Sequence, residues 1–156
     1  MVARTRAEIE SVWLHVNSVK KLFDRVVGLG PFGVGLDAML AWVPIPGIAA
    51  LASAGVGLWM ISQAFRVRAS AATIMRMIGY LGFDTATDVI PIPGVGSVID
   101  TIFQGQMLAG TALQKDIEST HWVEASEKDA RAAGLHDMHV SEMKRLGLRR
   151  LVYLHD

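Results

Sequence analysis

A motif that occurs twice constrains the fold of this chain more than any other feature of its sequence. Each copy consists of an Asp, six intervening residues and a Pro-Ile-Pro-Gly turn, with the Asp seven positions before the first Pro. The motif residues are Asp37, Pro44, Pro46 and Gly47 in the first copy and Asp84, Pro91, Pro93 and Gly94 in the second. Proline disfavours helix in the residue before it and Gly permits a tight turn, so each copy predicts a helix, a turn and a second helix. The sequence therefore predicts two tandem helical hairpins.

The distribution of charge around the hairpins predicts that they lie in a membrane. Apolar residues make up 51 % of the chain, and charged residues are sparse between Val26 and Gln114 but frequent on both sides. Each predicted helix is about 18 to 20 residues long, which is close to the length that crosses the hydrocarbon core of a bilayer. The predicted fold class is therefore an all-α membrane protein with about four transmembrane or membrane-inserted helices.

Changes in composition divide the chain into three parts. Residues 1–25 carry apolar side chains at helical spacing and predict an amphipathic helix, which either packs on the protein or lies in the membrane interface. Residues 26–114 form the duplicated hairpin domain, with repeats at about 26–68 and 72–115. Residues 115–156 form a polar cytoplasmic tail.

Cap and turn residues predict further structure in this tail. Ser126 is suited to begin a helix, and Gly134 and Gly147 are suited to end the two short helices that follow it. Residues 148–154 could form a strand, a short amphipathic helix or a docking peptide, and the sequence does not decide among these three.

Basic residues lie at one end of the hairpins only. Arg25, Arg66 and Lys115 are at the ends opposite the Pro-Ile-Pro-Gly turns, which have no Lys or Arg nearby. Cytoplasmic loops of membrane proteins carry an excess of Lys and Arg. The pattern therefore predicts a multi-pass protein with both termini in the cytoplasm.

The two motif copies also resemble the repeats of a known family. The residues that carry the resemblance are Gly35-Leu36-Asp37 with Pro44-Ile45-Pro46-Gly47, and Gly82-Phe83-Asp84 with Pro91-Ile92-Pro93-Gly94. They are similar to the Leu-Asp-x-x-x-x-x-Ile-Pro-x-x-Gly repeats of the bacterial membrane-protein family catalogued as domain of unknown function 4112. The resemblance covers roughly Leu22 to Ser119. It implies an integral membrane protein of helices, placed in a bacterial inner membrane, and it implies no activity.

Small residues form a stripe along the second helix of each hairpin. They recur every four positions and would let two helix backbones approach closely. The stripe residues are Ala49, Ser53 and Gly57 in the first hairpin and Ser97, Thr101, Gly105 and Ala109 in the second. Both helices are therefore predicted to pack against other helices, of the same protein or of a partner.

Three acids, Asp37, Asp84 and Asp100, are predicted to lie in one layer of the membrane domain. A helix rises 1.5 Å per residue, so each acid would lie about 9 Å from the turns. A carboxyl at that depth is costly unless it is paired, protonated or hydrated, and it is by default a functional candidate. A structural role is favoured, in which the acids bond backbone groups freed by the prolines; an ion or proton path is the alternative.

The sequence predicts no catalytic, cofactor or metal site. The chain has no Cys, and its five His residues lie outside the apolar region. His136 and His139 have a metal-like spacing, but no acid accompanies them in a firm helical frame, so they are interpreted as part of a solvated tail. The formal net charge of zero does not indicate nucleic-acid binding.

These observations predict a non-enzymatic small inner-membrane protein. It would be an accessory or scaffolding subunit in contact with membrane lipids, either packing against a larger membrane complex or forming a homo-oligomer. The alternative is a small proton or ion transporter or channel that uses the three acids. A third possibility, a soluble helical bundle, is disfavoured because the stretch from Ile48 to Phe65 has no charge.

Overall fold

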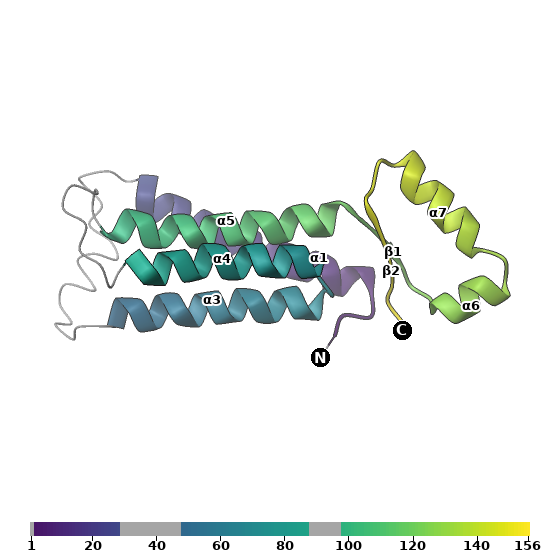
Figure 1. The fold of residues 1–156 in the computed structure, drawn as a ribbon, viewed down its shortest axis with the longest axis horizontal. Coiled ribbons are helices and arrows are strands. Elements are labelled where there is room, and N and C mark those ends of the chain that lie inside the picture. The colour runs from purple at the N-terminus through teal and green to yellow at the C-terminus, as the bar shows by residue number, and fades with distance from the viewer. Residues whose placement is uncertain (1, 29–47, 88–97) are drawn as a thin grey trace.

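The computed structural model describes residues 2–28, 48–87 and 98–156. Their larger part is a helical bundle (Figure 1) formed by α1 (Arg6–Gly28), α3 (Ile48–Arg66), α4 (Ala71–Thr87) and α5 (Val98–Glu118). A smaller part at one end of the bundle, here called the C-terminal module, consists of β1 (Thr120–Val123), α6 (Glu127–Ala132), α7 (His136–Arg145) and β2 (Arg150–Tyr153). Helices α1 and α4 begin at the module end and α3 and α5 finish there, so successive bundle helices alternate in direction.

Helix α1 begins with a capping box and packs against the bundle. The Thr5 hydroxyl accepts a hydrogen bond from the Glu8 amide (3.3 Å), and the Glu8 carboxylate accepts one from the Thr5 amide (3.2 Å). This reciprocal pair satisfies two amides that a helix start leaves without partners. Ile9, Val12 and Val16 then follow at spacings of three and four and are buried. The predicted N-terminal amphipathic helix is confirmed, and it packs on the protein.

The core of the bundle is formed by inward-facing side chains of all four helices. Its most deeply buried members include Val12, Val16, Met60, Ala64, Met77, Ala109 and Leu113. Burying a Val, Leu or Met side chain contributes about 1.5–3 kcal/mol. The core is therefore the main source of stability for the bundle.

The prediction of a membrane protein is wrong. Among the described residues no helix is long and apolar enough to cross a membrane, which contradicts both the membrane fold class and the multi-pass location in a bacterial inner membrane with cytoplasmic termini. The apolar side chains of α3, α4 and α5 instead pack on one another, and buried Gln63, Gln106 and Gln114 interrupt them. Low charge alone does not distinguish a helix that faces lipid from one that faces other helices.

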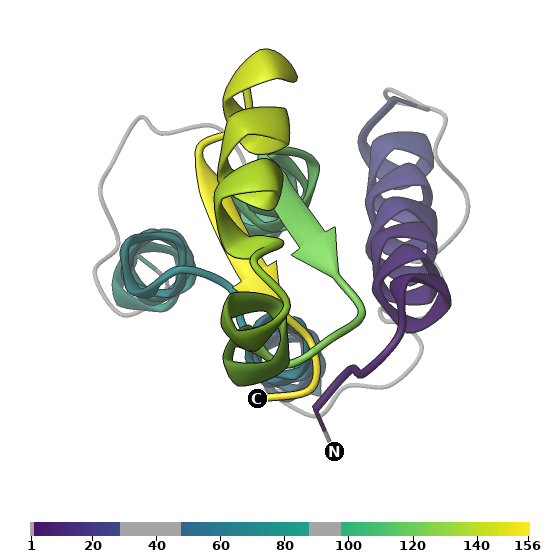
Figure 2. The same cartoon turned by 90° about the vertical axis from the view of Figure 1, so that its right-hand side faces the viewer.

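The all-α assignment is also wrong, because the C-terminal module contains two paired strands. β1 and β2 run parallel, with Thr120 opposite Arg150 and Val123 opposite Tyr153. Helices α6 and α7 form the connection between them, and Figure 2 views the molecule from this end. Of the three structures open to residues 148–154, the strand is the one observed.

The short helices of the module begin and end where cap residues stand. The Ser126 side chain caps α6 by accepting a hydrogen bond from the Asp129 amide. Gly134 and Gly147 have φ angles of +71° and +68°, a left-handed conformation that favours Gly after a helix. The predicted helix start at Ser126 and the two predicted helix ends are confirmed.

Candidate functional site

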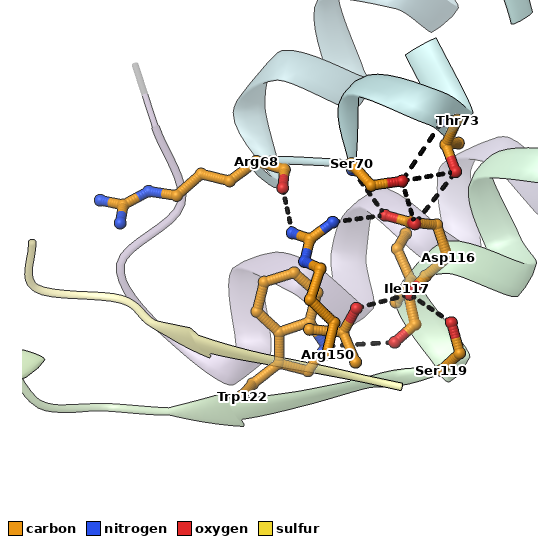
Figure 3. Close-up of polar contacts among 9 residues, drawn as sticks. Arg68, Ser70, Thr73, Asp116, Ile117, Ser119, Trp122 and Arg150 are labelled. Carbon is orange, nitrogen blue, oxygen red and sulfur yellow. Dashed lines mark hydrogen bonds and ion pairs between the residues drawn. The ribbon is translucent and has the colours of Figure 1, made fainter. Parts of the chain in front are cut away.

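Asp116, near the end of α5, is the centre of a hydrogen-bond network between the bundle and the C-terminal module (Figure 3). Its carboxylate accepts bonds from the Ser70 amide (3.0 Å), the Ser70 hydroxyl (2.7 Å) and the Thr73 hydroxyl (3.0 Å). On the other side, Arg150 of β2 donates to it at 2.9 Å. One carboxylate therefore joins the start of α4, the end of α5 and the last strand.

Arg150 has two further contacts that fix its orientation. Its second terminal nitrogen donates to the main-chain carbonyl of Arg68, in the connection between α3 and α4. Its guanidinium lies 5.9 Å from the centre of the Trp122 ring, a distance at which a cation is attracted to an aromatic face. Both side chains of the Arg150–Asp116 pair are largely buried, with 25 % and 11 % exposed.

Two other arginines hold the module from the bundle side. Arg68, which has a positive φ of 50°, donates to the carbonyl of Tyr153 at 2.9 Å. Arg6, at the start of α1, donates to the carbonyl of Trp122 through Nε (3.1 Å) and Nη2 (2.5 Å). Each strand of the module is therefore bonded to a different part of the bundle.

A cleft of about 470 Å³ lies between α1 and the module. Its lining residues include Arg6, Glu10, Trp13, His121, Glu142 and Leu146. Trp13 is held in place by a bond from its indole nitrogen to the Glu118 carboxylate (3.0 Å). The cleft therefore combines an aromatic side chain with two carboxylates, the guanidinium of Arg6 and the imidazole of His121.

Three ionisable side chains of the module gather beside this cleft. His121 comes from β1, and His139 and Glu142 come from α7; their potential ligand atoms all lie within 4.8 Å of one another. His121 Nε2 is 3.9 Å from the Glu142 carboxylate, and the two imidazole centres are 6.1 Å apart. Imidazole nitrogen and carboxylate oxygen are common ligands of zinc. Among the described residues, this is the group that could hold a metal ion.

Burial lowers the pKa of His121, the central imidazole. Desolvation lowers the pKa of His121 below its ordinary value, and Arg6 and His139 lower that pKa further, while Glu142 partly opposes the shift. A lowered pKa favours the neutral imidazole near neutral pH. His136 contacts a different residue: its Nδ1 lies 3.0 Å from the Tyr153 hydroxyl. Burial raises the pKa of Tyr153 above its ordinary value.

The residues selected from the sequence fall mainly outside this site. The turn residues Pro44, Pro46, Gly47, Pro91, Pro93 and Gly94, together with Asp37 and Ser97, lie outside the described residues. The helices α3, α4 and α5 contain Ala49, Ser53, Asp84, Asp100 and Thr101, whose side chains are not among those described. Gly57, Gly105 and Ala109 are buried within the bundle. The acid layer and the packing role of the stripe stay predictions.

Sequence reasoning missed Asp116, Arg150 and the partners of His139. The sequence alone does not indicate a firm helical frame that would place an acid beside His139. Helix α7 supplies that frame, and Glu142 follows His139 by three positions on it. A search for an acid three or four residues after each His would have found Glu142, because residues at that spacing share a helix face.

A bundle of alternating helices closed at one end by a β-α-α-β module is the class of protein that these observations define. The chain belongs to the family described as Domain of unknown function (DUF4112), whose family model matches residues 12–117. This confirms the family resemblance seen in the sequence. No curated protein matches the chain, and no solved structure matches it.

The family match includes Asp116 but stops before the C-terminal module. Residues 118–156, with both strands and all three members of the histidine and glutamate cluster, lie beyond it. The Asp116 network is therefore the place where the family domain holds a segment that the family model does not cover.

Proposed function

We propose that the protein is a non-enzymatic accessory or scaffolding protein that acts by self-association through the outer faces of α3 and α4. The supporting observation is a set of large apolar side chains left on these faces. Leu58 and Phe65 on α3 are 68 % and 60 % exposed, and Met75 on α4 is 66 % exposed. Ile78 lies one turn after Met75 and is also exposed. Exposed apolar faces of this kind mark interaction surfaces in many proteins.

The two faces carry few charges, which a contact between two copies of this chain requires. In the described side chains of α3 and α4, the charged residues are Arg66 and Arg76, and no acid accompanies them. A twofold dimer brings a patch against itself, so the patch must be self-complementary. Apolar contacts meet this requirement without any pairing of opposite charges.

The size of the faces agrees with a dimer. α3 has 19 residues and α4 has 17, so at 1.5 Å per residue they are about 28 and 26 Å long. With a width of about 10 Å each, they present on the order of 500 Å² of projected area. A standard interface buries about 800 Å² of accessible surface per partner, which a corrugated helical surface of this extent approaches.

Sedimentation equilibrium of the full chain tests the proposal. We expect the parent to form a dimer and Leu58→Glu or Met75→Glu to yield monomers, because each buries a charge in the contact. Leu14→Glu on α1 is the matched control, since Leu14 is similarly exposed at 52 % but lies on another helix. A monomeric parent, or a dimer that persists in both glutamate variants, would exclude this surface.

The transporter or channel alternative has less support than self-association. Transport through Asp37, Asp84 and Asp100 requires helices that cross a membrane, and the described part of the chain has none long and apolar enough.

A further inference from the structure

Helix α7 is held by little apolar contact. None of its residues is fully buried. Leu135, Met138 and Leu146 on and beside it are exposed, and Val140 and Met143 are half-buried. A ten-residue helix is marginal without tertiary packing. Contacts of other kinds therefore supplement this partial apolar burial in holding α7 against the strands.

Two α7 side chains face the strands as a pair. His139 and Glu142 are three residues apart and so share one face of the helix. His121 of β1 lies opposite them and is 7 % exposed. The His121 Nε2 to Glu142 distance of 3.9 Å is longer than a hydrogen bond. The three groups are close, but direct bonding does not account for their arrangement.

One atom of the cluster points independently to a ligand. His139 Nδ1 is buried and has no hydrogen-bond partner among the described residues. Buried polar atoms in folded proteins nearly always have a partner, and an exception requires an explanation such as a bound ion. An imidazole nitrogen without a proton donor or acceptor beside it is suited to coordinate a metal.

We propose that His121, His139 and Glu142 bind a divalent transition-metal ion, zinc in the first instance, which ties α7 to β1. Two imidazoles and one carboxylate form a donor set that zinc uses when it keeps a fourth position open. Zinc bonds of about 2.0–2.2 Å place tetrahedral ligand atoms about 3.3 Å apart. From separations within 4.8 Å, side-chain rotation and a small approach of α7 suffice to reach this geometry.

The fourth position of the ion would face the cleft. His121 and Glu142 both line the cleft beside α1, together with Arg6, Glu10 and Trp13. A water molecule or an anionic group of a small ligand could occupy that position, with Arg6 nearby to balance a negative charge. This site is independent of the proposed dimer surface, because its ligands lie on the module and the dimer residues lie on α3 and α4.

Zinc titration of the chelator-treated, tag-free full chain tests the proposal. We expect isothermal titration calorimetry to show one zinc ion per chain and thermal unfolding to shift to higher temperature with zinc. His139→Ala and Glu142→Gln should each weaken binding by at least about 100-fold, more than the 10- to 100-fold that the loss of an outer-shell partner causes. Circular dichroism verifies that both variants remain folded.

His136→Ala is the matched control. His136 is on the same helix as His139, but it contacts Tyr153 and is not one of the three clustered residues. This variant should bind zinc like the parent. Cobalt substitution adds a second readout, because the absorption of tetrahedral cobalt should appear in the parent and the control but not in His139→Ala. A parent that binds no zinc, or stoichiometric binding that persists without both His139 and Glu142, would overturn the assignment.

Discussion

At the scale of single residues, the Asp116 carboxylate accepts three hydrogen bonds from the start of α4 and one from Arg150 of the C-terminal module. Asp116→Ala removes the acceptor of four hydrogen bonds and leaves Arg150 largely buried without its acid. Removing one partner of a buried ion pair costs about 3–5 kcal/mol; we expect about 3 here, since Arg150 is partly exposed. Urea unfolding measures this loss. The control is Glu10→Ala, an exposed acid that should change stability by less than about 0.5 kcal/mol.

Glu8 gives the protein a pH dependence at its first helix. Hydrogen bonds from the amides of Arg4 and Thr5 hold the pKa of this carboxyl below its ordinary value of 4.5. The folded state therefore favours the charged form, and the stabilisation is complete above pH 4.5 and is lost as the pH falls through the folded-state pKa. Glu8→Gln should flatten the acid side of the curve of unfolding free energy against pH. Parallel curves for parent and variant below pH 4.5 would contradict this account.

At the scale of elements, two helical glycines should respond in opposite ways to a side chain. A Cβ on Gly110 of α5 would lie 3.1 Å from the Lys20 side chain and 3.3 Å from Val16, both on α1, whereas one on Gly79 of α4 meets nothing within 4 Å. Gly110→Leu should destabilise the protein by about 1–3 kcal/mol through overpacking. Gly79→Ala should stabilise it by about 0.5–1 kcal/mol through helix propensity. Thermal unfolding of both variants checks the signs, and a Gly110→Leu variant as stable as the parent would contradict the close α1–α5 contact.

The helices of the bundle were predictable from local sequence, and their environment was not. Apolar spacing and Pro-Gly punctuation predict helices where α1, α3, α4 and α5 are found. Most of the first helix of the first predicted hairpin lies outside the described residues. Whether such segments pack on lipid or on one another depends on their partners, which periodicity does not contain. Gln63 and Gln114, both buried, were the available signs of a protein interior.

The candidate site depends on contacts between distant segments, and this explains why sequence reasoning did not find it. β1 and β2 have four residues each, and their parallel pairing needs the whole connection through α6 and α7. His121 on β1 and His139 on α7 are neighbours only in the folded module. The spacing of His139 and Glu142 on one helix face could be predicted from the sequence, because this half of the site is local. The position of His121 on the strand could not.

At the scale of the whole molecule, three arginines determine whether the module and the bundle unfold together. Arg6, Arg68 and Arg150 each bond across the junction, to Trp122, Tyr153 and Asp116 respectively. We expect the parent to unfold in one transition. Removing Arg68 and Arg150 by substitution with Ala should uncouple the parts, because charge-assisted bonds contribute about 1.5–3 kcal/mol each.

Native-state hydrogen exchange distinguishes uncoupling from general destabilisation. In the double variant the amides of α7 and β2 should exchange faster, while those at the centre of α5 keep most of their protection, because local opening then no longer requires global unfolding. Arg131→Ala is the control: its side chain is 61 % exposed and pairs with Glu127 within α6, so it should leave both regions nearly unchanged. An equal fall in protection across α5 and α7 would show instead that the two parts remain one cooperative unit without the arginine contacts.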